Sequence, residues 1–270
     1  MRRRRALKCG FAAGSAALAG CTGLLGDRVS ESFDDDYAVG QETVLAVENR
    51  NGDVTVEATD GDRIGVSGTK RASSQSALDT IDVAVRTGEQ FVVEVTFGAG
   101  SDFSARAVDL TVTVPEGVTA DQVRTANGDV RVADVAGDLE ATSTNGSVEV
   151  RGVDGYVTAE TSNGDVTVRN ASGLDGARTT NGSVDVDLLA VRDDITCRTT
   201  NGDVTGRVGP DLSVAFRLET GNGEVSVRDL PHTVQTSRSG LLVGGIRDGT
   251  EPALRLESSN GDVTLRALES

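Results

Sequence analysis

The sequence repeats one short motif along most of its length: Asn-Gly, then an acid or Ser, then Val. From the second copy onward, successive copies lie 18, 18, 18, 20, 21 and 38 residues apart. A fixed period of about 20 residues indicates a repeat architecture, in which each coil stacks on the next. The last interval is long enough for two coils, with Ser239-Gly240 as a degenerate corner. The motif begins at Asn51, Asn127, Asn145, Asn163, Asn181, Asn201, Asn222 and Asn260.

Each 18-residue repeat divides into two halves of nine residues, and each half begins at Gly. Both halves carry one short strand with alternating apolar and polar residues, which indicates one buried and one solvated face. Gly supplies the positive φ that a tight corner needs, and Asn tolerates the same region. Asn-Gly between alternating strands also favours antiparallel hairpins, but hairpins do not explain why one corner returns every 18 residues. The pattern therefore predicts an all-β fold, a parallel β-solenoid of about 18–21 residues per coil.

The alternation assigns one side of each strand to the core and the other to solvent. Stacking brings Arg131 beside Glu149, an opposite-charge pair of the kind that stabilises sheets. The residue after each corner Gly alternates between Asp and Ser, which separates like charges on a ladder with rungs ~4.8 Å apart. The predicted core positions are Val130, Val132, Leu139, Ala141, Val148, Val150, Val157, Ala159, Val166, Val168, Val184 and Val186, with Val135, Val153, Ala171 and Leu189 at the second corner.

We expect four segments along the chain. Residues 1–20 are predicted to be a signal peptide, residues 21–40 a lipidated acidic tether, residues 41–118 a leading or capping β segment, and residues 119–270 the solenoid repeats. The tether contains Asp34-Asp35-Asp36. Extra residues at Ala190–Asp194, Gly209–Leu212 and Gly245–Pro252 are expected to form outward loops, and such insertions commonly carry the working surface of a solenoid.

The first residues have the composition of an export signal. Arg2–Arg5 form a basic region and Cys9–Leu18 a short apolar stretch, too short to span a membrane. Arg3 and Arg4 resemble a twin-arginine motif, a route that exports folded proteins. Leu18-Ala19-Gly20-Cys21 resembles a lipobox, which predicts a lipid anchor on Cys21 and a place at the outer face of the cell membrane. An ordinary secretory signal that contains a cysteine is the alternative.

The formal net charge of −16 comes from 42 acidic and 26 basic residues, with only two lysines, Lys8 and Lys70. A strongly acidic chain argues against nucleic-acid binding. The composition resembles that of secreted proteins of halophilic archaea, since concentrated salt shortens the Debye length to ~3 Å and screens the repulsion. An acidic surface that only improves solubility is the alternative.

No residue pattern points to catalysis or to a cofactor. Cys197 has no second cysteine beside it for a metal site or disulfide and is expected to be a small buried hydrophobe, and His232 is the sole histidine. Corner residues Asp129, Asp165 and Asp203 are weak calcium candidates, because too few oxygen ligands converge for a strong site. Their alternative role is to hydrogen-bond their own turns.

Arginines fall at or near outward positions of successive coils, and they form either a basic stripe or solvated partners of nearby acids. We favour the second role. The residues concerned are Arg131, Arg151, Arg169 and Arg207.

The segment Val108–Pro115, followed by repeated Asn-Gly-Asp-Val, resembles the putative-adhesin family of β-helical domains over residues 41–268. The resemblance implies a right-handed parallel β-helix at the cell envelope and supplies no catalytic residues. We therefore expect a monomeric, lipid-anchored, adhesin-like module for an envelope glycan or protein, without nucleic-acid partners. A structural spacer and a polysaccharide-active β-helix enzyme are the alternatives.

Overall fold

The computed structural model describes residues 28–40, 43–88, 90–98, 105–247, 249–251 and 253–269. Strands are the main element among these residues, and the one helix among them is the short α1 (Gln75–Leu78). The predicted signal peptide and lipobox, with Arg3, Arg4, Leu18, Ala19, Gly20 and Cys21, lie outside the described residues. Within the described part of the chain, no helix has the length and apolar character needed to cross a bilayer.

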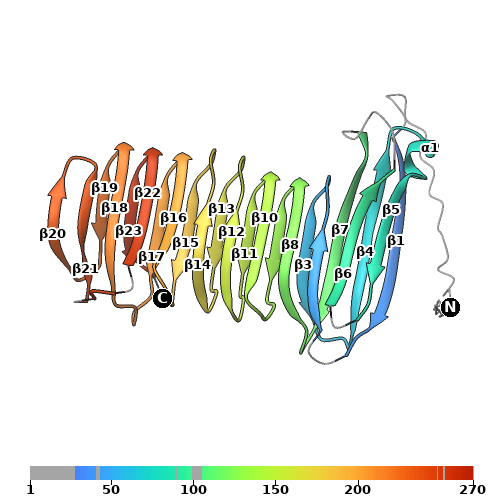
Figure 1. Ribbon diagram of the computed structural model, residues 1–270, viewed down its shortest axis with the longest axis horizontal. Coiled ribbons are helices and arrows are strands. Elements are labelled where there is room, and N and C mark those ends of the chain that lie inside the picture. Colours follow the sequence, from blue (N-terminus) through green and yellow to red (C-terminus); the bar gives the residue numbers. More distant parts are fainter. Residues whose placement is uncertain are drawn as a thin grey trace, which may run out of the picture.

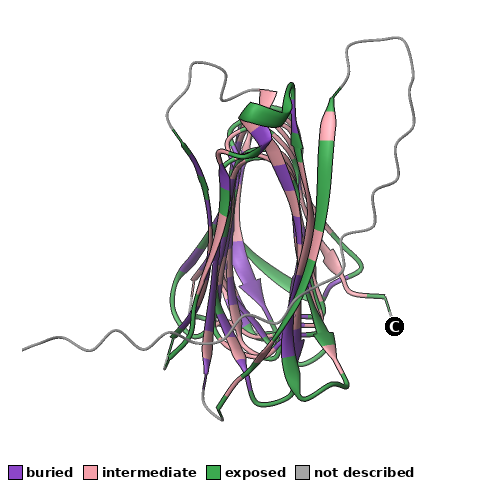
Figure 2. Ribbon diagram, turned by 90° about the vertical axis from the view of Figure 1, so that its right-hand side faces the viewer, coloured by how far each residue is buried: buried purple, intermediate pink, exposed green. Residues whose placement is uncertain are grey.

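The described strands form two sheets that face each other along the long axis of the molecule (Figures 1 and 2). In spatial order, sheet A contains β1 (Val29–Ala38), β4 (Arg63–Ala72), β7 (Ala107–Pro115), β3 (Val54–Thr59), β9 (Val130–Ala133), β11 (Val148–Arg151), β13 (Val166–Arg169), β15 (Val184–Leu188), β17 (Val204–Val208), β23 (Val263–Ala267) and β19 (Val225–Arg228). Sheet B contains β20 (His232–Arg238), β21 (Leu241–Ile246), β18 (Val214–Asn222), β22 (Ala253–Asn260), β16 (Ile195–Asn201), β14 (Gly173–Arg178), β12 (Tyr156–Glu160), β10 (Leu139–Asn145), β8 (Thr119–Asn127), β2 (Val44–Glu48), β6 (Gln90–Phe97) and β5 (Ile81–Arg86).

The middle coils are a parallel solenoid. Val130, Val148 and Val166 stack in register in sheet A, each 18 residues after the last, and Leu139 pairs with Val157 in sheet B. The predicted parallel stacking is confirmed here, and the antiparallel hairpin alternative is wrong for these coils.

The chain passes between the sheets at two edges, which we call the Asn-Gly edge and the loop edge. The Asn-Gly edge leads from sheet B to sheet A through Asn-Gly corners such as 145–147. The loop edge leads back from sheet A to sheet B through segments such as 134–138, 152–155, 170–172 and 189–194.

The core lies between the sheets and consists mainly of valine, leucine and alanine. Every predicted core position from Val130 to Val186 is buried, as are Val135, Val153 and Ala171. Each fully buried valine or leucine contributes about 1.5–3 kcal/mol relative to an exposed one, so stacking of identical rows holds the coils together.

Leu189 was predicted to be buried and is 36% exposed, whereas Leu188 is completely buried. The reason is strand length. Strand β15 continues to Leu188 in register with Val208, so the alternation carries Leu188 inward and Leu189 outward. The nine-residue spacing of the earlier corners does not hold in this coil.

The N-terminal end departs from the simple stack. Strands β2 and β3 lie between β6/β7 on one side and β8/β9 on the other, so the coil with the Asn51 corner continues the solenoid. Strands β4 and β1 then extend sheet A in antiparallel fashion, and a small second core beneath α1 packs at this end. The tether prediction for residues 21–40 is wrong over Val29–Ala38, because all ten residues of β1 pair with β4.

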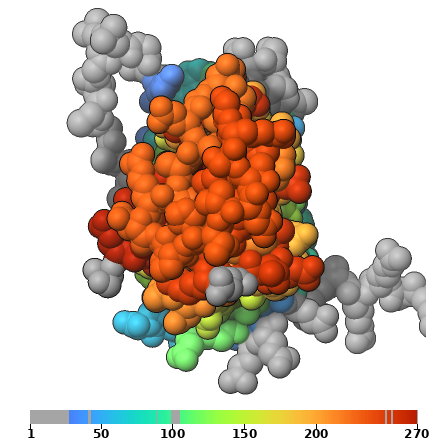
Figure 3. All heavy atoms as spheres, turned by 90° about the vertical axis from the view of Figure 1, so that its left-hand side faces the viewer, coloured from blue at the N-terminus to red at the C-terminus, as the bar shows by residue number. Residues whose placement is uncertain are grey.

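At the C-terminal end, strands again stack in an order that differs from their order in the chain. Strands β22 and β23, the last in the chain, insert between β16/β17 and β18/β19 (Figure 1). Ser239-Gly240 is therefore not a degenerate solenoid corner, since it forms the turn of the antiparallel hairpin of β20 and β21. Viewed from this end, residues from the last coils form a closed surface (Figure 3). The loop predicted at Gly245–Pro252 is also shorter, because Gly245 and Ile246 belong to β21.

Candidate functional site

The Asn-Gly edge is a continuous ladder of side-chain amides. In each of six successive contacts the Nδ2 atom of one asparagine donates to the Oδ1 atom of its neighbour, over 2.8 to 3.1 Å. Asn51 instead donates to the carbonyl of Arg106. The spatial order of the ladder is Asn127, Asn145, Asn163, Asn181, Asn201, Asn260 and Asn222.

A second polar row lies beneath the amides and faces inward. Each hydroxyl in it is buried and donates to the carbonyl of a corner glycine on an adjoining coil, over 2.8 to 3.1 Å. Sequence reasoning missed this row, although its signal is present as a Ser or Thr two residues before every corner asparagine from Asn127 onward. The row comprises Thr125, Ser143, Thr161, Thr179, Thr199, Ser258 and Thr220.

The corner aspartates also bond between coils. The Oδ1 atom of Asp129 accepts from the amide of Ser147 at 2.8 Å, and Asp165 accepts from Ser183 at 2.7 Å. Asp203 accepts in the same way from Asp262. The expectation that they bond their own turns is therefore wrong, because the partner is the next coil. Among the residues with described positions, no group of three or more His, Cys, Asp or Glu is placed to hold a metal ion.

The outward arginines are partners of acids. Arg131 contacts Asp129 at 2.7 Å and the predicted partner Glu149 at 3.9 Å, while Arg151 also pairs with Glu149.

Farther along sheet A, Arg207 donates to Asp187 at 2.7 Å. Arg169 pairs with Asp185. Asp187 is only 3% exposed, and burial raises the pKa of its carboxyl. These pairs favour the role of charge partners of nearby acids over a free basic stripe, although the Arg207–Asp187 pair is largely buried and not solvated as predicted.

The loop edge is irregular. The Ala190–Asp194 and Gly209–Leu212 segments both lie on it, between sheet A and sheet B strands. Arg192 reaches back along the edge to Asp138, over 2.7 Å, and to Asp175. Its guanidinium lies 4.2 Å from the ring centroid of Tyr156, a cation–π contact. Arg192 therefore ties its own loop to the three preceding coils.

These contacts change the acidity of both partners. The Tyr156 amide and then the Arg192 guanidinium donate to Asp138 and hold its pKa below the usual 3.8. Hydrogen bonds from Arg192 to Asp175 and Asp138 raise the pKa of the arginine. The Ala190–Asp194 loop is thus held by charge rather than free.

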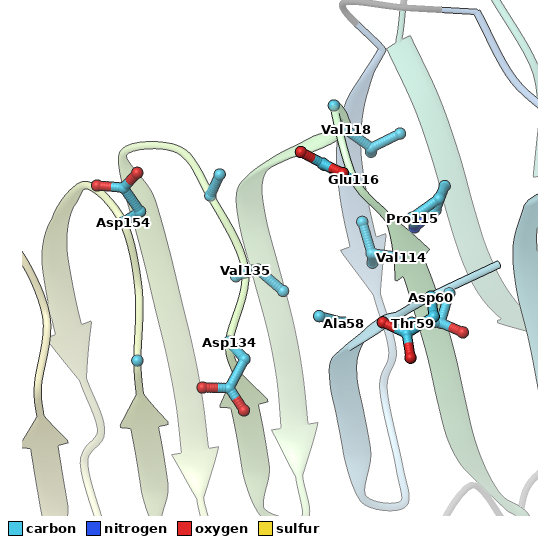
Figure 4. Close-up of a pocket in the computed structure, with 13 residues that line it drawn as sticks. Ala58, Thr59, Asp60, Val114, Pro115, Glu116, Val118, Asp134, Val135 and Asp154 are labelled. Atoms are coloured by element: carbon cyan, nitrogen blue, oxygen red, sulfur yellow. The ribbon is translucent and has the colours of Figure 1, made fainter. Parts of the chain in front are cut away.

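A groove of about 560 Å³ opens on the loop edge where the N-terminal strands separate from the regular coils (Figure 4). It forms because β3 leaves for β4 after Thr59 and does not cross to sheet B as the later coils do. Its walls combine apolar and acidic side chains. The lining residues are Ala58, Thr59, Asp60, Val114, Pro115, Glu116, Gly117, Val118, Asp134, Val135, Ala136, Gly152 and Asp154.

Cys197 and His232, the sole histidine, are poorly placed to act together in nucleophilic catalysis. Cys197 is buried, and burial raises the pKa of its thiol to about 12, so the thiolate nucleophile is suppressed. The Nδ1 atom of His232 lies 2.8 Å from the carbonyl of Leu230, and the ring packs against Phe216.

Comparison with known proteins identifies similar chains. Residues 118–266 match the family model described as Toastrack DUF4097. No curated protein matches the chain.

Several solved structures align along most of the chain at low identity. A putative adhesin from Parabacteroides distasonis is 12% identical, with 90% of this chain and 98% of that chain covered and a TM-score of 0.39. A putative adhesin from Bacteroides fragilis is 10% identical, with 88% and 97% covered and a TM-score of 0.39. A putative lipid binding protein from P. distasonis is 8% identical, with 89% and 97% covered and a TM-score of 0.41.

Proposed function

The chain belongs to the Toastrack DUF4097 family, and from that premise we propose that it is an adhesin-like module that binds a glycan or protein of the cell envelope. The groove on the loop edge carries this proposal. It is the place where an otherwise regular solenoid opens a concave surface with both apolar and carboxylate groups, and concave, mostly apolar surfaces with a few polar groups suit ligand binding.

The Asn-Gly edge supports the same assignment by contrast. Its amides, buried hydroxyls and corner carboxylates are occupied with one another or with backbone groups of adjoining coils. A partner would have to break these hydrogen bonds to form its own. The loop edge therefore offers the better contact surface.

We further propose that the protein is exported by the twin-arginine route and anchored by lipid on Cys21 at the outer membrane face. The supports are Arg3 and Arg4 and the lipobox that ends at Cys21. Since β1 begins at Val29, only a short segment would separate the lipid from the N-terminal end of the solenoid. The acidic, lysine-poor composition supports a halophilic setting.

The proposal includes a right-handed coil of 18–21 residues and a binding role without catalysis or cofactor. Two observations support the non-catalytic role: the raised pKa of the Cys197 thiol, and the contact of the His232 ring nitrogen with the carbonyl of Leu230.

Co-sedimentation of the purified protein with isolated envelopes in high salt tests the binding role. An Ala58→Trp variant fills the groove from an exposed lining position, while Thr144→Trp places the same bulk at an exposed position beside the Asn-Gly edge. We expect saturable binding that Ala58→Trp weakens and Thr144→Trp preserves. Loss of binding to envelopes stripped of surface glycan would identify a glycan partner. If the folded protein does not bind envelopes at all, the structural spacer is the better assignment.

A further inference from the structure

Three Asn-x-Ser sequences occur in the chain, at Asn145, Asn170 and Asn181. Asn-x-Ser/Thr is the acceptor sequence for N-linked glycans on exported proteins. Asn145 and Asn181 are corners of the Asn-Gly edge, whereas Asn170 lies on the loop edge. All three asparagines are exposed, so exposure alone does not separate them.

The two corner asparagines have their amide nitrogens engaged. The Nδ2 atom of Asn145 donates to Asn127 at 2.9 Å, and its Oδ1 atom accepts from Asn163 at 2.8 Å. Asn181 is held in the same way between Asn163 and Asn201, over 2.8 and 2.9 Å. A glycan on either nitrogen would have to displace an amide stacked between two neighbouring rungs.

Asn170 differs in both backbone and side chain. It follows β13 with a φ of 51°, a left-handed conformation that Asn tolerates better than most residues. Its backbone amide donates to the buried carboxylate of Asp187 at 3.1 Å, which fixes the turn. Its side-chain amide makes no hydrogen bond to any residue within the described ranges. The nitrogen is therefore presented to solvent from a defined turn.

We propose that Asn170 is the N-glycosylation site of this protein and that the corner sites at Asn145 and Asn181 stay unmodified. The inference rests on the proposed export to the cell surface. Because the twin-arginine route delivers folded chains, the folded structure would decide which of the three nitrogens is accessible to the glycosylating enzyme.

The transfer needs a lipid-linked glycan phosphate as donor and a membrane glycosyltransferase as catalyst. The Nδ2 atom of Asn170 gives one proton to solvent water and bonds to the anomeric carbon of the glycan. The bond from that carbon to the phosphate oxygen breaks, and the lipid phosphate leaves with the electron pair. The Ser172 hydroxyl, which completes the acceptor sequence, donates to Asp154 at 3.0 Å. Because Asp154 lines the groove, the glycan would flank it.

Glycopeptide mass spectrometry of the full-length protein from its own producing cells tests the proposal, with cytoplasm and envelope analysed separately. We expect the envelope protein to carry glycan on the Asn170 peptide and none on the Asn145 and Asn181 peptides. Ser172→Ala should abolish the modification while it leaves Asn170 in place, and Ser172→Thr should retain it. Asn170→Asp should also abolish glycosylation, and aspartate tolerates the same turn conformation.

The outcomes separate this proposal from the proposed function. Bare Asn170 on protein found in the envelope would overturn glycosylation and leave surface location intact. Protein confined to the cytoplasm would overturn both. Glycan on Asn145 or Asn181 would show that the amide ladder does not block modification, and would overturn the assignment of Asn170 as the selected site.

Discussion

The Asn-Gly edge and the loop edge join the same two sheets, yet they differ in what occupies their polar groups. At the Asn-Gly edge, from Asn127 to Asn222, the corner asparagine of one rung bonds to the equivalent asparagine of the next. At the loop edge the connections vary in length, Arg192 ties one loop to the three preceding coils, and a groove opens beside the N-terminal strands.

The difference shows how a repeat can hold a fold and still leave room for variation. Identical rungs make hydrogen bonds between coils that reinforce one another, but every rung must then keep the same residues. Because one edge and the core supply this order, the opposite edge is free to accept insertions. Mutations at matched positions on the two edges test this division.

The largest contrast should come from glycine. At Gly164 φ is +146°, and an added Cβ atom would lie 2.3 Å from the carbonyl oxygen of Gly146 on the adjoining coil. Gly117 on the loop edge also has a positive φ, +87°, but no atom lies within 4 Å of its added Cβ. We expect Gly164→Ala to lower the free energy of unfolding by about 4 kcal/mol or more and Gly117→Ala by about 1 kcal/mol. Chemical denaturation measures both, and similar losses would refute the tight approach of coils at the Asn-Gly edge.

The buried hydroxyl row should rank next. Thr161 donates to the carbonyl of Gly146 at 2.8 Å, so Thr161→Val should leave a buried carbonyl without that donor and cost about 1–3 kcal/mol. Thr158→Val is the matched control on β12, the strand that ends one residue before Thr161, because the Thr158 side chain faces outward. It should change stability by less than about 0.5 kcal/mol. Equal effects in denaturation curves would mean that the inward hydroxyls contribute only volume.

The sequence predicted the regular part of the molecule because its period and alternation are local signals. Corner glycines, inward valines and parallel stacking all follow from the nine-residue halves. The order of the coils at the C-terminal end cannot be predicted from these halves. Every coil presents the same Asn-Gly corner, so any coil can stack on any other. Strand β22 lies between β16 and β18, and a sequence pattern that is the same in every coil does not predict this order.

The wrong prediction for β1 and the failure to predict the groove have similar causes. In β1, burial recurs only weakly, at Val29, Phe33 and Tyr37, so the acid-rich segment lacks the period of a half-buried strand and was expected to be a tether. The groove is assembled from segments near residues 58, 116, 135 and 154, which only the folded topology brings together. The sequence predicted insertions on a working edge but not the concave surface.

Within the amide ladder, position should decide the effect of a substitution. Asn163 both donates to Asn145 and accepts from Asn181, at 2.8 Å in each case, whereas Asn222 at the end of the ladder donates to Asn260 alone. Since these amides are exposed, water replaces part of the hydrogen bonding that a substitution removes. We expect Asn163→Ala to cost about 1 kcal/mol and Asn222→Ala about half of that. Thermal unfolding resolves the difference, and equal shifts would argue against bonding along the ladder.

The smallest effect on stability is expected at Arg192, because its ion pairs are exposed and solvent screens them. The sensitive readout is Tyr156, one of only two tyrosines in a chain without tryptophan. Arg192→Ala should remove the cation–π contact and make tyrosine fluorescence easier to quench, and Arg192→Lys should restore less of the contact because it lacks the planar guanidinium.

The pH dependence of Arg192→Ala has a defined sign. The pKa of Asp138 is lowered in the folded protein, so its pairing contributes stability above the usual carboxyl pKa of 3.8 and loses it as the pH falls through the lowered value. The difference in melting temperature between wild type and Arg192→Ala should therefore be present at neutral pH, shrink toward pH 3, and also shrink in 1 M salt. A difference that persists under both conditions would show that Arg192 acts by packing, and that the loop edge is held by more than charge.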